Sequence, residues 1–392
     1  MTASAAHQPV TPEPASAAHQ PVSPEPVSAA HQSRTPEPAP PAGGPTESAA
    51  APPPTGPTRA GLAWQAPRQP PTAPDGAATA PAPLEGIPAS QPGQPRAEWG
   101  WRGRANRFSG GTLNLIATRD ELVHRAARRR LLRPFSRTMS VVVANPKGGA
   151  AKTPTALLAA ATLGFHRGGY TLAWDNNETR GTLGMRAESA THEQTVINLL
   201  HNIDEFLATT ASVGRLSAYL RPQSARFDVL ASDDAAGSME IIDDEAFTKL
   251  WTALCRFYRL IVVDTGNNIR SANWQSATAV ADCLVVPTTV QRDVADSGLW
   301  MLDHLIRTGR ADLAENAVAV VSCADPKPDT ELLDEIVERY RKVVRDVVVI
   351  PYDRLIRSGG RIEFDALAIP TRRAWLMACS SIVDSLAIRD QS

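Results

Sequence analysis

Two lysines and a threonine flank a pair of glycines in one short stretch, Lys147-Gly-Gly-Ala-Ala-Lys-Thr153. Adjacent glycines let successive backbone N–H groups turn inward around an anion, and a lysine adds a positive charge at the same place. A threonine directly after that lysine can ligate Mg²⁺ through its hydroxyl. These residue types at this spacing predict a loop that binds nucleotide phosphates, with Lys152 facing the β- and γ-phosphates and Thr153 facing the metal ion.

The sequence on either side of this loop is what such a loop requires. The apolar run Met139–Ala144 precedes it and the alanine-rich run Thr155–Gly164 follows it. These runs predict a strand that enters the loop and a helix that leaves it. We therefore expect a nucleotide with Mg²⁺ as the ligand. The predicted contact residues are Lys147, Gly148, Gly149, Ala150, Ala151, Lys152, Thr153 and Pro154.

Two aspartates end further apolar runs and are candidates for the metal site. Tyr170–Asp175 follows the glycine pair that ends the first helix, and Tyr258–Asp264 is a second apolar run with an acid at its end. Parallel strands place their carboxyl ends at one edge of a sheet, so both acids are predicted to lie beside the loop. Asp264 would orient Mg²⁺ through water, with Asp175 and Thr153 near the ion. A turn or a helix cap is the alternative role for a single aspartate at a strand end.

The remaining runs fix the fold class. Residues 281–287, 317–323 and 346–353 are further short apolar segments, each separated from the next by a helix-length stretch. Strands that alternate with helices, and that are apolar throughout, predict an α/β fold with a doubly wound, mostly parallel sheet. The amphipathic stretch 373–387 is almost without basic residues and is predicted to be a helix packed on this domain.

These motifs resemble those of the ParA/MinD family of partitioning and positioning ATPases. The run KGGAAKT is similar to the family's deviant Walker-A loop KGGVGKT, segment 175–184 to its DxDPxxG segment, and the Asp264 strand to its Walker-B strand. The resemblance covers about residues 138–385. It implies a P-loop NTPase in which ATP closes two protomers face to face, hydrolysis reopens them, and Lys147 reaches the phosphates of the partner's nucleotide.

Finer features resemble one branch of the family. The run RGTLG after the second strand, the Pro-Tyr-Asp at 351–353 and the proline-rich amino-terminal extension look more like the actinobacterial MinD-like proteins, including those associated with type VII secretion, than like the compact plasmid ParA proteins.

Two positions in the loop depart from the family pattern. Ala151 stands where the loop usually has glycine, so the backbone there either avoids a positive φ or carries strain of about 1 kcal/mol. Pro154 has no backbone N–H to donate to the α-phosphate, although its fixed φ suits the first turn of a helix. We expect one missing charge-assisted hydrogen bond, worth roughly 1.5–3 kcal/mol.

A third departure concerns catalysis. Asn177 stands where the second aspartate of the family's segment acts on the attacking water. An amide positions water but does not accept its proton, so we expect slow hydrolysis, with Lys147, Asp175 and Asn177 as the catalytic residues. Two alternatives stay open, namely that Glu178 takes over this role or that the register is shifted by one residue.

Residues 1–96 have a different composition. They hold most of the prolines, and they start with three copies of a twelve-residue repeat, at 4–14, 16–26 and 28–38. Such a stretch buries too little apolar area to offset the entropy of ordering it, so we expect a disordered segment with polyproline II character. It is either a passive spacer or a docking segment for a partner with an aromatic groove.

A basic segment, residues 97–137, separates this stretch from the predicted nucleotide-binding domain at 138–392. Thr118 with Glu121 is predicted to form a capping box and Pro134 to end the helix, so a basic amphipathic helix is expected at about 119–133. Its outer face either is simply solvated, binds DNA without sequence preference, or contacts an anionic membrane surface. The candidate DNA contacts are Arg125, Arg128, Arg129, Arg130 and Arg133.

The composition of the chain limits where the protein is expected in the cell and which kinds of catalytic or metal site are expected in it. The formal net charge is −1, the four cysteines are widely spaced, and neither a zinc-binding spacing nor a catalytic triad is present. No signal peptide or long apolar span is found, so we expect a cytoplasmic protein with no integral membrane contact, associated with the nucleoid if it binds DNA.

Two classes of function remain. The first is a slow ATPase that forms an ATP-dependent homodimer and partitions or positions cargo, with plasmid or chromosomal DNA as the first candidate. The second is a nucleotide-binding regulatory or scaffold protein that hydrolyses poorly and is linked to type VII secretion. An unidentified protein partner is expected in both. A metabolic kinase or reductase of similar fold is disfavoured, because Lys147 would have no part to play in it.

Overall fold

The computed structural model describes residues 95–110, 112–177, 181–188, 192–232 and 242–391. The chain divides between Glu85 and Gly86, and every described residue belongs to the second unit. The expected disordered segment lies outside the described residues except for Pro95 and Arg96, and Glu178 lies outside them as well. The domain bounds expected from the sequence stay a prediction.

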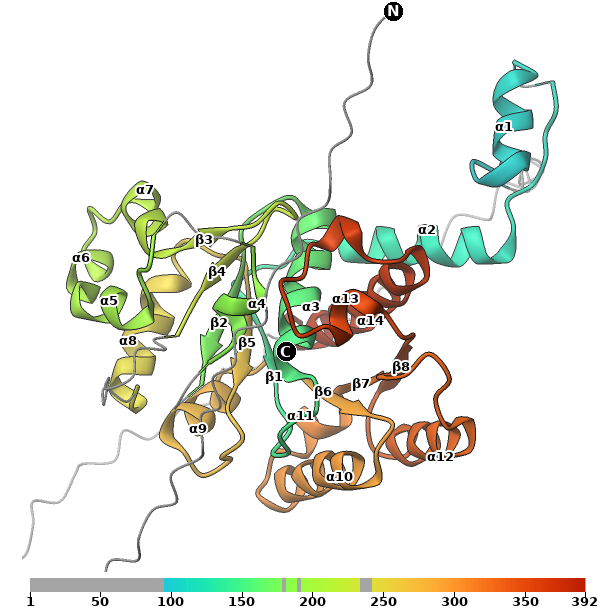
Figure 1. Ribbon diagram of the computed structural model, residues 1–392. Helices are drawn as coiled ribbons and strands as arrows, with labels where there is room; N and C mark the ends of the chain where they lie inside the picture. Colours follow the sequence, from blue (N-terminus) through green and yellow to red (C-terminus); the bar gives the residue numbers. More distant parts are fainter. Residues whose placement is uncertain (1–94, 111, 178–180, 189–191, 233–241, 392) are drawn as a thin grey trace, which may run out of the picture. The chain divides into compact units, whose positions relative to one another are not determined.

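The second unit is built on one eight-stranded sheet with the order β3-β4-β2-β5-β1-β6-β7-β8 (Figure 1). All neighbouring strands are parallel except β3 and β4, which are antiparallel. The strands are β1 (Met139–Val143), β2 (Thr171–Asn176), β3 (Arg221–Pro222), β4 (Asp228–Leu230), β5 (Leu260–Thr265), β6 (Cys283–Thr289), β7 (Val318–Ser322) and β8 (Asp346–Ile350). Central β1 is buried along its whole length, as expected of a largely apolar strand in a parallel sheet that is covered on both faces.

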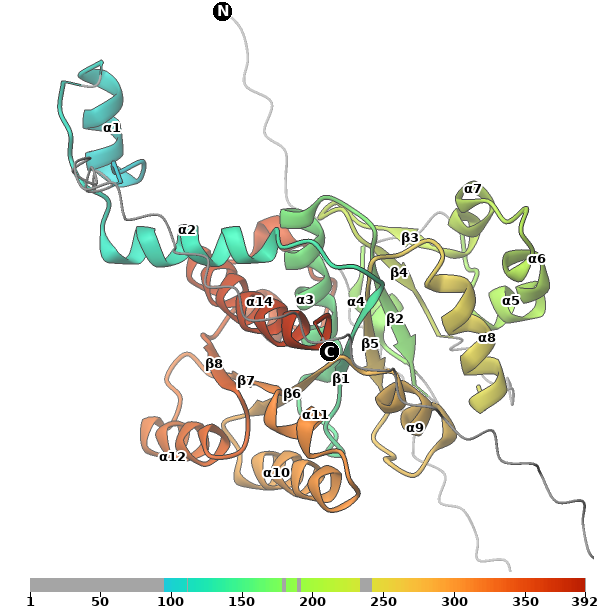
Figure 2. The same cartoon turned by 180° about the vertical axis from the view of Figure 1, so that it is seen from behind.

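Helices cover both faces of this sheet (Figures 1 and 2). Because strand side chains alternate, Val142 of β1 belongs to one apolar core while Val141 and Val143 belong to the other. The first core is completed by helices between residues 196 and 341, and the second by helices at 119–131, 152–167 and 369–389. The doubly wound fold expected from the alternation of strands and helices is therefore confirmed.

The helices have the following bounds. They are α1 (Gly100–Phe108), α2 (Arg119–Leu131), α3 (Lys152–Arg167), α4 (Leu183–Arg186), α5 (Val196–His201), α6 (Ile203–Leu207), α7 (Val213–Leu216), α8 (Asp244–Leu254), α9 (Ala272–Ala279), α10 (Arg292–Arg307), α11 (Ala311–Glu315), α12 (Thr330–Arg341), α13 (Arg354–Arg357) and α14 (Ile369–Arg389), with short 3-10 turns η1 (Ser217–Tyr219) and η2 (Phe364–Ala366). The stretch expected to pack on the domain is α14, and it is buried along most of its length.

The basic helix packs its apolar side against the core, while the role of its outer face stays a prediction. In α2, Ala127 and Leu131 are buried against α14 and α3. The Thr118 hydroxyl accepts the Glu121 N–H at 3.3 Å, so half of the expected capping box forms. The other half does not, because the buried Glu121 carboxylate instead accepts the Glu98 N–H at 2.7 Å and a hydrogen bond from Arg125.

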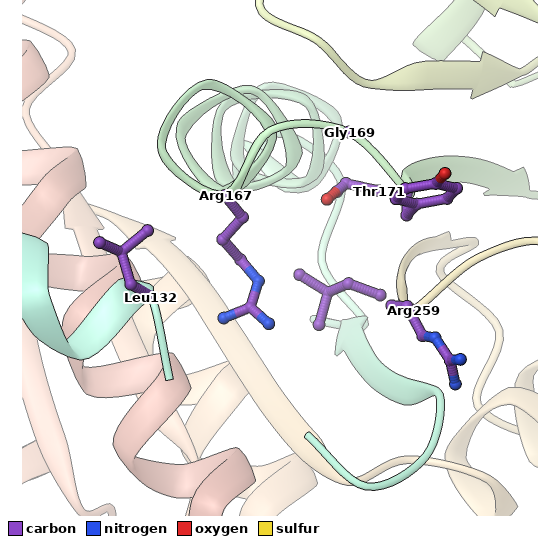
Figure 3. Close-up of a pocket in the computed structure, with 7 residues that line it drawn as sticks. Leu132, Arg167, Gly169, Thr171 and Arg259 are labelled. Carbon is purple, nitrogen blue, oxygen red and sulfur yellow. The ribbon is translucent and has the colours of Figure 1, made fainter. Parts of the chain in front are cut away.

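One arginine joins the end of α2 to the end of α3. Arg167 donates to the carbonyls of Leu131 and Arg133, and its guanidinium lies 4.6 Å from the ring centroid of Phe135. Figure 3 shows Arg167 and Arg259 on opposite sides of a small pocket at the amino ends of β2 and β5. The last carbonyls of a helix have no partner within the helix, so Arg167 supplies the hydrogen bonds that α2 lacks at its end.

Candidate functional site

The glycine-rich loop joins the carboxyl end of β1 to the start of α3, as predicted. Buried Asn145 holds its first residues in place. The Asn145 side-chain amide donates to the carbonyls of Pro287 at 2.8 Å and Val294 at 3.3 Å, and its oxygen accepts the Lys147 N–H at 3.0 Å. The loop is thus tied to β6 and α10, so its backbone N–H groups are positioned before any ligand arrives.

Two residues of the loop have left-handed backbones. Gly149 has φ +79° and Ala151 has φ +64°. Of the two alternatives at Ala151, the strained one is therefore present, at a cost of about 1–2 kcal/mol for a residue with a Cβ. Pro154 is the third residue of α3, where a backbone N–H would have no partner within the helix, so the fold loses no internal hydrogen bond there.

The second lysine of the loop lies over the loop itself. The Lys152 ammonium donates to the Lys147 carbonyl at 3.2 Å and to the side-chain oxygen of Asn267. Asn267 follows β5 closely, and sequence reasoning did not select it. An asparagine three residues after the strand-end acid was the available signal, but a polar turn residue is too common to single out.

The two candidate metal ligands lie on adjacent strands. Asp175 and Asp264 pair directly in the register of β2 with β5, and both are almost fully buried. One oxygen of Asp175 accepts the Leu183 N–H at 3.1 Å and the Ser232 hydroxyl at 3.0 Å. The carboxyl ends of the two strands therefore meet beside the loop, where the sequence placed them.

The charged forms of Asp175 and Asp264 are both disfavoured by their surroundings. Burial raises the pKa of Asp175, against the hydrogen bonds from Leu183 and Ser232. Burial also raises the pKa of Asp264, and the charge of Asp175 adds to that shift, while Thr153 and Lys152 oppose it. One oxygen of each aspartate is buried with no hydrogen-bond partner among the described residues.

This donor set fits Mg²⁺. Free carboxylate oxygens next to a threonine hydroxyl are hard ligands. A divalent cation would offset the burial that raises both pKa values and the charge of Asp175 that adds to the shift of Asp264. No group of three or more histidine, cysteine, aspartate or glutamate side chains in the described residues could hold a metal by itself. A site of this kind depends on phosphate oxygens and water for its remaining ligands, which is usual for Mg²⁺.

Gly181 explains the close packing around Asp175. A Cβ at this position would lie 2.1 Å from an Asp175 oxygen and 2.1 Å from the Ser232 hydroxyl. Glycine is therefore required for the chain to pass over the carboxylate. This is a physical reason for the first glycine of the run RGTLG.

Lys147 lies at the mouth of the loop and forms an ion pair within its own chain. Its ammonium is 3.1 Å from a carboxylate oxygen of Asp293, in the first turn of α10, and both side chains are about half exposed or more, at 49% and 62%. Asp293 is far away in sequence, and no motif pointed to it. The role across a dimer interface stays a prediction, and in this structure the lysine is held in its own protomer.

A cleft opens over the loop. Besides the loop residues from Gly148 to Pro154, it is lined by Asn177, Thr182, Arg186, Thr265 and Asn267. The Thr182 hydroxyl donates to that of Thr153 at 3.2 Å. Asn177 lies in the cleft directly after β2, and its role in orienting water stays a prediction.

The five arginines proposed to contact DNA are not equivalent. Arg125 is largely enclosed and forms ion pairs with Glu121 and, at 3.3 Å, with Glu98, so it is not available to an external phosphate. Arg130 lies 3.5 Å from Asp384 of α14. The exposed members of the set are Arg128, Arg129, Arg130 and Arg133. Across the part of the chain that the structure describes, no helix has the length and hydropathy needed to cross a membrane.

Comparison with known structures identifies the architecture. A ParA family ATPase from Chlorobium tepidum TLS superposes on 62% of this chain and 98% of its own chain, with 19% identity and a TM-score of 0.52. The chain has the ParA-type fold. This confirms the fold inferred from the phosphate loop and the strand pattern, whereas membership of the actinobacterial branch stays an expectation. No known family profile matches the chain.

Comparison with curated sequences finds a mycobacterial secretion-associated relative. The ESX-1 secretion-associated protein EspI, in two strains of Mycobacterium tuberculosis, is 24% identical over 287 residues, which are 73% of this chain and 42% of EspI. The chain therefore spans less than half the length of the curated relatives it matches.

Proposed function

We propose that this protein is an ATP-dependent dimerisation switch that hydrolyses ATP slowly. The observation that carries this proposal is the meeting of Lys152, Thr153, Asp175 and Asp264 beside a glycine-rich loop at the carboxyl edge of a ParA-type sheet. Ligands of open α/β sheets bind at this edge, and a loop that precedes a helix directs backbone N–H groups at phosphate.

Each residue of the site has a defined task in this proposal. The loop N–H groups and the Lys152 ammonium bind the phosphates, and Thr153 with the two aspartates holds Mg²⁺. Bound Mg²⁺ supplies neutralising charge at the phosphates. Asn177 orients water without taking its proton, which makes the chemical step slow. Lys147 leaves Asp293 and pairs with the phosphates held by the second protomer.

The test uses two lysine variants. We expect Lys152→Ala to abolish ATP binding in calorimetry, because it removes the charge that faces the phosphates. Lys147→Ala should bind ATP about as well as wild type but remain monomeric in sedimentation with ATP and Mg²⁺. Lys249→Ala, on the surface of α8, is the matched control and should behave as wild type. Equal ATP affinity in Lys152→Ala and wild type would overturn the assignment of the site.

We propose that this switch binds DNA as its cargo, through the outer face of α2. Its support is the cluster of exposed arginines formed by Arg128 and Arg129 in the last turn of α2 and by Arg133 two residues after it. Binding to phosphates alone is independent of base sequence and falls steeply with salt. Changing these three arginines to glutamate should remove filter binding of duplex DNA at low salt, whereas Arg125→Gln should change it little, because Arg125 is already paired.

A secretion-associated regulatory role is the second candidate. It is favoured by the similarity to EspI and by the two positions, Pro154 and Asn177, that weaken nucleotide contacts and hydrolysis. In this role the ATP-bound dimer would bind a protein partner rather than DNA. Absence of DNA binding even at low salt, together with a stable ATP-bound dimer, would favour this candidate over the first.

A further inference from the structure

An arginine that no sequence motif singled out lies in the cleft over the phosphate loop. Arg186 is the last residue of α4 and lines this cleft together with Pro154 and Thr182. The Arg186 backbone N–H donates to the Thr182 carbonyl at 3.1 Å, so the two residues lie one helical turn apart on the same side of α4. Because the Thr182 hydroxyl contacts that of Thr153 at 3.2 Å, this side of α4 faces the start of α3.

The side chain of Arg186 is held in place but its hydrogen-bonding capacity is mostly unused. Its Nη2 donates to the Ile356 carbonyl at 2.9 Å, and its Nε is buried with no hydrogen-bond partner among the described residues. The backbone is fixed as well, since the Arg186 carbonyl accepts the Ile362 N–H at 2.8 Å. A guanidinium has five N–H donors, so this one is positioned by the protein and still has donors for a ligand.

The charge of this guanidinium is not balanced within the part of the chain that the structure describes. Burial lowers the pKa of Arg186, and no carboxylate of the described residues opposes that shift. Arginine nevertheless stays charged at neutral pH. A half-buried charge without a counter-ion is unfavourable, and a phosphate in the cleft would supply the opposite charge and accept hydrogen bonds from the planar fork.

We propose that Arg186 binds the α-phosphate of the nucleotide and partly replaces the hydrogen-bond donor that Pro154 lacks. This inference rests on the proposed function, because it needs a nucleotide in the cleft. The proline at the third position of α3 removes the backbone N–H that is expected to face this phosphate. Arg186 lines the same cleft with unused donors and an unbalanced charge, so a side chain does there what the backbone cannot.

Calorimetry with ATP and with ADP, each with Mg²⁺, tests the assignment. Both nucleotides carry the α-phosphate, so Arg186→Met should weaken both by about tenfold or more. Arg186→Lys keeps the charge but loses the planar fork, and its affinities should lie between those of wild type and Arg186→Met. Weaker binding of ATP with unchanged binding of ADP would place the guanidinium at the γ-phosphate and would overturn the proposal.

Arg221 provides a matched control. Its guanidinium also donates to a backbone carbonyl, that of Gly184 at 3.2 Å, and its Nε is also buried without a partner among the described residues, but it does not line the cleft. Arg221→Met should therefore bind ATP and ADP as wild type does, and the midpoint of urea unfolding shows that each variant is folded. Equal weakening in Arg221→Met would mean that the packing of α4, and not a phosphate contact, explains the loss in Arg186→Met.

A double-variant cycle separates a phosphate contact from a structural role. Pro154→Thr restores the backbone donor, so Arg186→Met should weaken ATP about threefold or less in that background, against about tenfold in the wild-type background. Equal losses in the two backgrounds would overturn the proposal. Wild-type affinity in Arg186→Met, with binding still abolished in Lys152→Ala, would overturn this inference alone. Equal affinity of wild type and Lys152→Ala would overturn the proposed function and this inference with it.

Discussion

The loop tolerates an alanine where its backbone is left-handed. Ala151 has φ +64°, whereas the φ of its neighbour Ala150 is not positive. The left-handed conformation costs a Cβ-bearing residue about 1–2 kcal/mol, which glycine would avoid. Glycine in turn loses about 0.5–1 kcal/mol, because it has more conformational freedom than alanine in the unfolded chain. The loop is thus less stable than the same loop with glycine, at the residue directly before α3.

We expect Ala151→Gly to stabilise the protein by up to about 1 kcal/mol, measured as a higher midpoint of urea unfolding. Ala150→Gly is the matched control. Since its backbone gains nothing from glycine, this change should destabilise the protein by about 0.5–1 kcal/mol. A lower midpoint for Ala151→Gly would mean that the methyl group makes contacts worth more than the backbone strain.

The ion pair between Lys147 and Asp293 competes with the role proposed for this lysine. An exposed pair of this kind contributes little to stability, because water screens its two charges. Releasing Lys147 in the free protomer should therefore favour the ATP-bound dimer, in which the lysine has another partner. The carboxylate's pKa is lowered by Lys147, so Asp293 is ionised at neutral pH and the restraint is present there.

Asp293→Asn should strengthen ATP-dependent dimerisation about two- to fivefold, as measured by sedimentation equilibrium with ATP and Mg²⁺. Asp303→Asn, also on α10 and paired with Arg307, is the control and should leave the dimer unchanged. A weaker dimer in Asp293→Asn would show instead that Asp293 orients Lys147 toward the partner.

At the scale of elements, α2 depends on a side chain from another helix. Arg167 of α3 donates to the carbonyl of Leu131, the last residue of α2, and to that of Arg133 just after the helix, while Arg259 lines the same pocket from the other side (Figure 3). Replacing Arg167 leaves those carbonyls to water and removes the contact with Phe135. The basic face of α2 would then be held less firmly against the core.

We expect Arg167→Met to lower the opening free energy of the last turn of α2 by about 1–3 kcal/mol, read from amide hydrogen exchange of that helix. Exchange in β1 and β5 should be unchanged. Arg259→Met also removes one positive charge from the pocket, but it removes no hydrogen bond to α2. Amide exchange in α2 should therefore be unchanged in this variant. Equal effects of the two variants would show that pocket charge, and not the hydrogen bonds to the carbonyls, stabilises the helix end.

The elements also show what the sequence could and could not predict. All six strands predicted from apolar runs exist, because a buried parallel strand is visible locally as a continuous apolar segment. The antiparallel pair β3 and β4 was not predicted, since Arg221–Pro222 and Asp228–Leu230 are too short and too polar to show a pattern. At the site, the loop and the two aspartates followed from sequence, but Asn267 and Asp293 reach the lysines only through tertiary folding.

For the molecule as a whole, the proposed switch needs a closed dimer that persists. The residue after β2 in the cleft is an amide, and Pro154 cannot donate to an α-phosphate, so both hydrolysis and nucleotide affinity should be reduced. Turnover well below the roughly 1–10³ s⁻¹ of ordinary enzymes is expected. Slow turnover lengthens the time that two protomers stay together, and thereby the time that a cargo or partner remains bound.

Asn177→Asp should raise the rate of phosphate release, because a carboxylate in the cleft can accept the proton of an attacking water. Pro154→Thr should leave that rate unchanged but tighten ATP about tenfold, since it restores one N–H donor at the start of α3. Glu178→Ala tests the remaining alternative for the residue that handles the water. If the rate is unchanged in Asn177→Asp and lost in Glu178→Ala, Glu178 has that role, the enzyme is not weakened at position 177, and the regulatory candidate loses its main support.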